Sequence, residues 1–393
     1  MPTLERKREP EIVPQYSLTG DLLSFLRCGL QYRYLNGSAL PPSRPVQLWF
    51  GEFIHGVMEA AYRIWHAGTP PAFPWPMNVT PFGGPSPAGR LPHDIGTIGE
   101  TVEETLHALG KNARSGATRA SAYRRAERAV NELAPHLFPL IQSAEEKVIG
   151  TRDVPPLPAG TPWHPRCTRY ELHGIIDVLT NVQLSAVPTG NVIRDAVYAA
   201  CPGLAGQYEV IVDYKGSRRP ATNHPFWDQA EWQLQTYAWL RTRQPQAIPV
   251  AAGVLIYINE LAPGNEDLVN LRREISHGHT DVAPSPGTPD AYVLNTWRPG
   301  ATIPAFSLEY RMRRAIRVVP FDAVSQANAT AQFDQVVVDI EHCVADENAA
   351  GDILAHWQSV GDDDTCVACD FRHFCPSPAP HTGHHTIDAP PAQ

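Results

Sequence analysis

The segment YEVIVDYKG, residues 208–216, decides the fold because it joins an apolar strand to charged residues at its end. The run of valine and isoleucine is typical of a buried β-strand, and the glycine marks a turn. Asp213 and Lys215 are two residues apart, so their side chains share one face of this strand. The upstream segment YELHGIIDVLT, residues 170–180, has the same form, and Asp177 ends its apolar run. If the two strands pair, Asp177 joins Asp213 and Lys215.

Two carboxylates at the end of an apolar strand are costly unless a cation neutralises them. Carboxylate oxygens with open water positions suit Mg²⁺ or Mn²⁺. Such a cation acidifies a bound water and stabilises the charge that develops on a phosphate. Lys215 is then placed to position that water or the phosphate. The alternative interpretation is a simple ion pair between Asp213 and Lys215 at a strand end.

A strongly patterned helix is predicted over residues 226–242, FWDQAEWQLQTYAWLRT. Gln233 and Tyr237 are four residues apart, so they lie on one face of this helix. A buried glutamine and tyrosine that face a carboxylate site can orient a lysine, a water or a phosphate. The alternative places Tyr237 in the core and Gln233 on the surface.

Another helix is predicted over residues 48–66, and it contains the sequence GEFIH from Gly51 to His55. A neutral imidazole can bind a divalent metal, so His55 is a candidate ligand to the same cation. The alternative is an ordinary core histidine.

Three cysteines near the C-terminus have the spacing C-x2-C-x5-C: Cys366, Cys369 and Cys375. Cysteines at this spacing in an intracellular protein typically bind a metal or a cluster. Cys28, in the aromatic-rich sequence FLRCGLQYRY, is our candidate for the fourth ligand, and it would fasten the two ends of the chain together. Four thiolates fit either a [4Fe–4S] cluster or a structural zinc ion, and the spacing alone does not separate these two.

The chain has 393 residues, of which 43% are hydrophobic and 19% are charged. This composition is typical of a soluble globular protein. No apolar run approaches the roughly 20 residues of a membrane span, and the first residues lack the apolar region of a signal peptide. We therefore expect a cytoplasmic protein with no membrane partner. The net charge of −9 argues against a surface that is basic throughout, although it leaves room for a local basic groove.

Proline-rich stretches divide the chain into segments, and loops are expected at 68–98, 181–206 and 259–304. Two helices are predicted over 99–147, a strand over 306–313 and a helix over 321–346. The predicted segments are a leader (1–15), N-terminal helices with Cys28 and His55 (16–66), a proline-rich loop and helical insertion (67–168), a core with insertions (169–320), a C-terminal helix with the cysteine cluster (321–376) and a disordered tail (377–393).

These motifs, in this order, resemble the RecB-like nucleases of the PD-(D/E)XK superfamily. The similarity is greatest to the iron–sulfur branch, which includes the AddB nuclease domain and the CRISPR-associated exonucleases of adaptation. The family order is an N-terminal cysteine, G-x3-H, G-x-x-D, D-x-K, Q-x3-Y and C-x2-C-x5-C. The corresponding positions are Cys28, Gly51 to His55, Gly174 to Asp177, Asp213 to Lys215, Gln233 to Tyr237, and the three C-terminal cysteines.

The resemblance implies a role for each motif residue and an α/β core of the restriction-endonuclease type with helical additions. His55, Asp177 and Asp213 are expected to bind the metal together with the carbonyl of Tyr214. Lys215 is the expected catalytic lysine, assisted by the carboxylates and by Gln233 and Tyr237. The resemblance also favours a [4Fe–4S] cluster over zinc for Cys28, Cys366, Cys369 and Cys375.

The implied function is metal-dependent cleavage of DNA, with single strands or frayed ends as substrate, in repair, recombination or defence. One alternative is an endonuclease for duplex or structured DNA, and another is an iron–sulfur scaffold subunit that binds DNA and cuts little. The sequence contains no P-loop pattern G-x4-G-K-[ST]. A helicase or another subunit of a repair or defence complex is therefore an expected partner. Arg218 and Arg219 follow Lys215 so closely that we expect them to contact DNA phosphates.

Overall fold

The computed structural model describes residues 13–37, 46–69, 71–80, 88–181 and 190–360, together with positions 365–366, 369, 371–372 and 375–376. Most of the predicted leader and all of the predicted C-terminal tail lie outside the described residues. The described residues form one six-stranded sheet in the order β1-β3-β4-β5-β6, in which β2 pairs with β3. The strands are β1 (Gln15–Ser17), β2 (Ile141–Asp153), β3 (Arg169–Thr180), β4 (Glu209–Lys215), β5 (Val250–Tyr257) and β6 (Ile316–Pro320).

Strand β3 organises the sheet because three strands pair with it. β2 pairs antiparallel with β3 along nearly the whole length of both strands. β1 pairs in parallel with its first half, through Glu171 to His173, and β4 pairs antiparallel with its last three residues, Val178 to Thr180. The four residues between these two pairings, 174–177, therefore have no strand beside them on that edge within the described residues. Asp177 is the last of the four.

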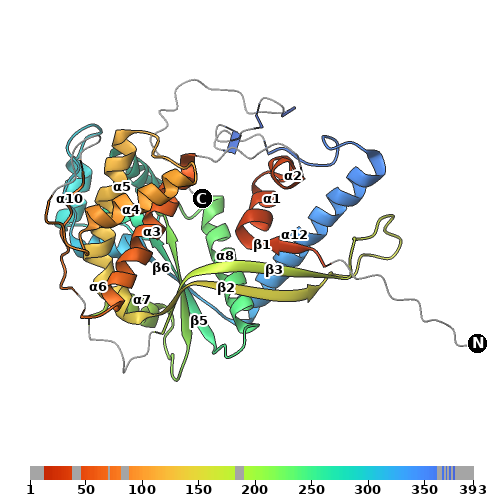
Figure 1. Ribbon diagram of the computed structural model, residues 1–393, viewed down its shortest axis with the longest axis horizontal. Helices are drawn as coiled ribbons and strands as arrows, with labels where there is room; N and C mark the ends of the chain where they lie inside the picture. Colours follow the sequence, from red (N-terminus) through yellow and green to blue (C-terminus); the bar gives the residue numbers. More distant parts are fainter. Residues whose placement is uncertain are drawn as a thin grey trace, which may run out of the picture.

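Successive residues of β4 enter two different cores, because side chains of a strand alternate between its faces. Val210, Val212 and Tyr214 pack on one face with α3 (Val46–His66), α4 (Ile95–Ala108), α5 (Gly116–Arg128) and α6 (Ala134–Leu137). Ile211 packs on the other face with α8 (Pro225–Thr242) and α12 (Ala323–Ala350). In Figure 1, α3, α4 and α5 gather at one end of the molecule, while β2 and β3 run away from them toward α12.

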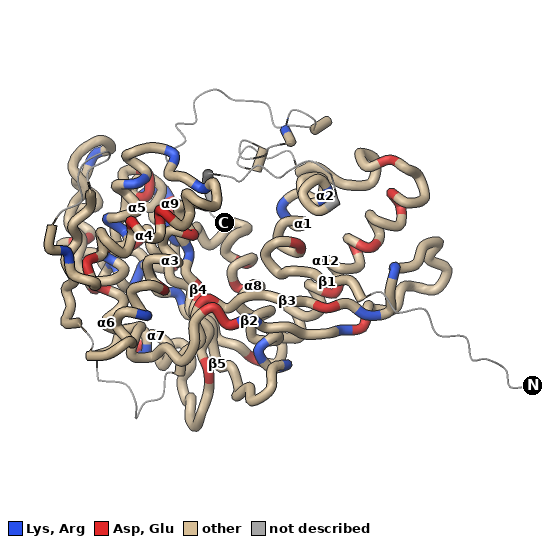
Figure 2. Tube along the Cα trace, viewed as in Figure 1, with Lys and Arg blue, Asp and Glu red and all other residues tan. Residues whose placement is uncertain are grey.

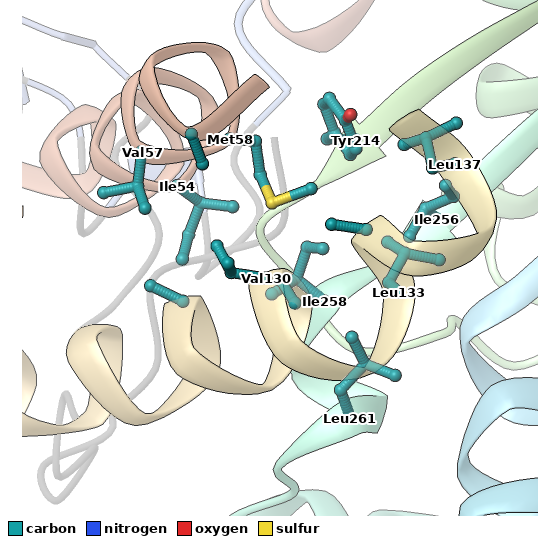
Figure 3. Close-up of a cluster of buried hydrophobic side chains, with 14 of the residues drawn as sticks. Ile54, Val57, Met58, Val130, Leu133, Leu137, Tyr214, Ile256, Ile258 and Leu261 are labelled. Atoms are coloured by element: carbon teal, nitrogen blue, oxygen red, sulfur yellow. The ribbon is translucent and has the colours of Figure 1, made fainter. Parts of the chain in front are cut away.

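Helix α3 is fixed over the end of β4 by the first of these cores. Figure 3 shows Ile54, Val57 and Met58 of α3 in a cluster with Val130 and Leu133, and with Tyr214 and Ile256 from the sheet. Val130 and Leu133 belong to the π-helical turn η2 (Ala129–Leu133), which leads into α6 and the short turn η3 (Phe138–Leu140). This packing decides where the polar residues of α3 come to lie.

Two further groups of helices flank the sheet. A third apolar cluster joins α9 (Asn265–His277), α10 (Pro289–Thr296) and α11 (Leu308–Ala315), next to the turn η4 (Ile258–Leu261). At the other end, the π-helical turn η1 (Leu18–Leu22) leads into α1 (Leu23–Arg27) and α2 (Gly29–Gly37). Tyr32 of α2 packs against Trp357, which follows α12. None of the described helices is long and apolar enough to cross a membrane.

The structure corrects several elements predicted from the sequence. The expected loop at 181–206 contains α7 (Val192–Ala200), and the expected loop at 259–304 contains α9 and α10. Residues 306–313 were predicted as a strand, but most of them belong to α11, whose first turn is capped by Ser307. The second helix expected within 99–147 ends well before 147, because residues 141–153 form β2. Helix formers such as Ala144, Glu145 and Glu146 concealed this strand, which is held by its long ladder with β3.

Candidate active site

The centre of the candidate site is the point at which β3 and β4 separate. Their ladder ends at the pair Val178 and Val212. The next residues are Asp177 on β3 and Asp213 on β4, so the strands diverge where the two acids begin. The Asp177 carboxylate accepts a hydrogen bond from the Tyr214 backbone N–H at 2.9 Å. The diverging strands are thus still joined, but by a side chain.

Helix α8 holds Lys215 beside Asp213. The Lys215 Nζ lies 2.7 Å from Asp213 Oδ2 and donates to Gln233 Oε1 at 2.6 Å. The Gln233 amide contacts Asp213 Oδ1 at 3.5 Å and the hydroxyl oxygen of Tyr237 at 3.3 Å. Asp213 is 4% exposed and Gln233 is 7% exposed. The ammonium group is therefore fixed by buried partners, and a long side chain has lost its freedom before any substrate binds.

The glycines of the motifs mark close approaches between elements. A Cβ at Gly174 would lie 2.6 Å from the ring of Tyr237, and a Cβ at Gly216 would lie 3.2 Å from the Cα of Gly51. Gly174 thus allows α8 to approach β3, while Gly216 and Gly51 allow α3 to approach the end of β4. The glycines set the distance at which the polar residues meet.

His55 reaches the site from α3. Its Nε2 lies 3.1 Å from the Tyr214 carbonyl, and a carbonyl only accepts, so Nε2 carries the proton in this contact. Nδ1 then presents a lone pair toward Asp177 Oδ2, 3.6 Å away. Two acceptors that face each other need a proton or a metal ion between them.

The pKa shifts of Asp177 and His55 also indicate that a positive charge is favoured between these two side chains. Burial, together with the neighbouring charge of Asp213, raises the pKa of Asp177, while His55 opposes the rise. Burial lowers the pKa of His55, but Asp177 and Asp213 outweigh it and the net pKa is raised. The pocket therefore retains a proton readily when no other cation is present.

These residues fit a divalent cation. Asp213 Oδ2 is buried, and the contact that engages it is the ion pair with Lys215. Asp177, Asp213, His55 and the Tyr214 carbonyl offer hard oxygen donors and one imidazole nitrogen, the set that Mg²⁺ and Mn²⁺ accept. Figure 2 shows acidic positions gathered where β2, β3 and β4 come together.

The structure adds one acidic residue that the sequence did not indicate. Within the described residues, one group of three side chains brings its possible ligand atoms within 4.8 Å of one another: His55, Glu145 and Asp177. Glu145 belongs to β2, the strand that was predicted as helix. Burial alternates along this strand from Lys147 onward, but the residues KVIGTRD do not alternate between polar and apolar, so the sequence held no clear period-two signal for the strand.

The cysteines of the C-terminal motif lie near the N-terminal helices. Cys28, Cys366, Cys369 and Cys375 all line one pocket, together with Gln31 and Tyr34 of α2. Among the described residues, no three of the four sulfurs lie within 4.8 Å of one another. The four cysteines that we chose from the sequence therefore line the same pocket, although their sulfurs are not closely grouped.

The structure argues against the predicted contact between Arg219 and DNA. Arg219 is 3% exposed, and its guanidinium donates to Asp281 and to the carbonyls of Arg314 and Ile316. Arg218 is more exposed, but it pairs with the buried Glu274 at 2.5 Å. The prediction relied on the closeness of both arginines to Lys215 in the sequence. In the structure, acids that are remote in sequence engage them: Glu260 of η4, Glu274 of α9 and Asp281. A role of Arg218 at the DNA remains a prediction.

Comparison with known families agrees with this geometry. Residues 204–376 match the family model described as the PD-(D/E)XK nuclease superfamily. This stretch includes Asp213, Lys215, Gln233 and Tyr237, and the fold adds His55 and Asp177 from outside it. No curated protein matches the chain.

Residues 204–376 are thus similar to a PD-(D/E)XK nuclease domain, and the mixed α/β fold with its central sheet is consistent with the predicted restriction-endonuclease-like core. Nucleases of this superfamily are hydrolases that use Mg²⁺ or Mn²⁺. The match does not distinguish the iron–sulfur branch from the rest of the superfamily.

Gly174→Ala tests the packing of α8 on β3. The added methyl group would collide with Tyr237, so we expect Gln233 and Lys215 to shift with the helix. A misplacement of about 1 Å costs roughly 100-fold in rate, and we expect a loss of that order in cleavage, with Mn²⁺ binding retained. Nuclease assays and calorimetry on the same preparation measure both effects. Gly68→Ala, at a position where a Cβ would meet nothing within 4 Å, is the matched control. Wild-type activity in Gly174→Ala would contradict this interpretation.

Arg219→Ala tests the structural role of the buried arginine. Asp281 is exposed enough to be solvated after the change, but the carbonyls of Arg314 and Ile316 lose their buried donor. An unsatisfied buried polar group costs about 1–3 kcal/mol, and we expect a loss of that order in urea unfolding. Arg63→Ala removes an exposed ion pair with Glu59 and should cost at most about 1 kcal/mol. If Arg219→Ala kept its stability and instead weakened DNA binding with a flatter salt dependence, the original assignment to DNA would be restored.

Proposed function

We propose that this protein is a metal-dependent DNA nuclease that acts on single-stranded DNA or DNA ends. The observation that supports this proposal best is the position of Lys215, whose Nζ is held between Asp213 and Gln233 at the divergence of β3 and β4. A purely structural ion pair needs neither the glutamine nor the second acid nor His55. All of them converge on this one strand end.

In this proposal Asp177, Asp213, the Tyr214 carbonyl and His55 hold a divalent cation. When bound, that cation supplies an acidified water and stabilises charge on the scissile phosphate. Lys215 keeps its ammonium close to the reacting phosphate. Gln233 prevents the ammonium from swinging away, and Tyr237 holds the Gln233 amide. The chain's own contribution is a fixed positive charge next to two fixed negative charges.

The charge distribution is relevant to how DNA is held. Many described arginines form ion pairs with acids of the same chain, for example Arg119 with Glu103 and Arg125 with Asp267. Figure 2 shows basic and acidic positions interspersed over α4, α5 and α9. These arginines are engaged within the protein, so we expect few phosphate contacts and a shallow salt dependence of binding.

Substitutions in the site test the proposed chemistry. Asp213→Asn and Lys215→Ala should each lower cleavage of end-labelled single-stranded DNA at least ~100-fold, because a group acting at the reacting atoms is typically worth that factor. Asp195→Asn, an exposed aspartate whose ion pair is with its neighbour Arg194, is the matched control.

Substrate form then separates the alternatives. Linear DNA cut from its ends, with a circular single strand left intact, supports an exonuclease. A circle cut as fast as the linear strand would indicate an endonuclease, and RNA cut as fast as DNA would contradict the DNA assignment. Absence of cleavage by the wild-type protein with both Mg²⁺ and Mn²⁺ would favour a scaffold.

We propose further that the cysteine pocket holds a [4Fe–4S] cluster. The convergence of Cys28 with Cys366, Cys369 and Cys375 on one pocket supports a bound group there. A single zinc ion with Zn–S bonds of about 2.3 Å requires closely spaced sulfurs, whereas among the described residues no three of these four sulfurs lie within 4.8 Å of one another. A larger group fits this separation better. It would tie α2 to the C-terminal segment, which already contacts it through Tyr34 and Phe371.

Anaerobic purification tests the cluster. The wild-type protein should contain about four irons per chain, as a [4Fe–4S] cluster requires, and its visible absorbance should bleach on reduction. Cys366→Ser should lose the iron and lower the unfolding temperature. Cys201→Ser changes a cysteine outside the pocket and should keep the iron. Stoichiometric zinc without iron in the wild-type protein would show that the pocket is a zinc site.

A further inference from the structure

Glu145 lies opposite Asp177 in the ladder between β2 and β3. The flanking pairs are Ala144 with Val178 and Glu146 with Ile176, so the register continues across this position. Glu145 itself has φ of 54°, a left-handed conformation that residues with a Cβ rarely adopt. The strand is thus twisted at one residue without a change in pairing, and that residue carries a carboxylate.

The carboxylate of Glu145 lies on the open side of the site. His55, Asp177 and Tyr214 line one pocket together with Glu145, whereas Asp213 and Lys215 do not line it. The possible ligand atoms of His55, Glu145 and Asp177 lie within 4.8 Å of one another. Opposite donors around a Mg²⁺ ion are about 4.2 Å apart at bonds of 2.0–2.1 Å. Small rotations of these side chains would therefore close them on one cation.

Within the described residues, no hydrogen bond or ion pair engages the carboxylate of Glu145. The nearby charges of His55 and Arg63 favour its ionised form, but burial and Glu59 oppose them, and the net pKa of Glu145 is raised. The other acid that lines the pocket, Glu59, is paired with Arg63. Glu145 and Asp177 are like charges at close range, and such an arrangement is unfavourable unless a cation lies between them.

The contacts of Asp213 explain why another carboxylate is useful. Lys215 and Gln233 engage both oxygens of Asp213, which reduces the charge it offers to a metal. Of the two ligands that line the pocket, Asp177 and His55, only Asp177 carries a negative charge. Glu145 supplies the second.

We propose that Glu145 is a ligand for the divalent cation, together with Asp177 and His55, on the pocket side of the site. This inference rests on the proposed nuclease function, because it assumes that the site binds Mg²⁺ or Mn²⁺. It extends the ligand set to a residue outside the sequence motifs, on a strand that the motifs do not include.

Mn²⁺ titration by calorimetry tests the role of Glu145 without relying on cleavage. Glu145→Gln keeps the shape of the side chain and removes its charge. Loss of groups that support a metal site costs 10–100-fold in affinity, and we expect Glu145→Gln to weaken Mn²⁺ binding by roughly that factor. The rise in unfolding temperature caused by Mn²⁺ should shrink accordingly. The unfolding temperature in metal-free buffer should stay close to that of the wild type.

Glu146→Gln is the matched control, because it removes the same charge one residue away from a side chain that lies near Arg241 instead. It should bind Mn²⁺ as the wild-type protein does. Wild-type Mn²⁺ affinity in Glu145→Gln would overturn the proposal, whether or not cleavage is lost. If the wild-type protein itself bound no Mn²⁺, the proposed nuclease function would fail, and the two failures are therefore distinguishable.

Discussion

The separation of β3 from β4 after Val178 and Val212 is the constraint on which the rest of the site depends. A continuous ladder would leave no space between Asp177 and Asp213. The divergence leaves a buried carboxylate, Asp213, and a partly buried one, Asp177, next to the point of separation, with one hydrogen bond from the Tyr214 N–H to Asp177. Buried acids are tolerated only with partners. The surrounding elements supply these partners: Lys215 for Asp213, and His55 for Asp177.

The remaining elements act by holding these partners at fixed distances. Gly174 brings α8 close enough for Tyr237 and Gln233 to reach Lys215, and the contact of Gly216 with Gly51 brings α3 over the end of β4. The apolar cluster around Ile54 and Met58 then determines which face of α3 presents His55 (Figure 3). Packing on both faces of the sheet thus converts a strand end into a site with defined geometry.

Some of this organisation could be predicted from the sequence because it depends on local periodicity. The two-residue spacing of Asp213 and Lys215 placed both on one face, and the four-residue spacing of Gln233 and Tyr237 did the same on α8. The structure brings these residues together, although their catalytic roles remain predictions.

Long-range contacts set the limit of that prediction. The position of Glu145 depends on β2. The residues around Glu145 do not favour a strand, and β2 forms because it pairs with β3. Arg219 depends on Asp281, which is far away in sequence and turns an expected DNA contact into an internal ion pair. Residues 308–315 form a helix because Tyr310 and Phe306 pack into the third apolar cluster. Each of these outcomes follows from a partner that local sequence does not reveal.

The most direct test of the metal centre is anomalous diffraction from crystals of the protein grown with Mn²⁺. We predict a manganese peak enclosed by Asp177, Asp213, His55 and the Tyr214 carbonyl, at the divergence of β3 and β4. Crystals that contain millimolar Mn²⁺ but show no manganese at this position, or show it only elsewhere on the protein, would contradict the assignment of this strand end as the metal centre.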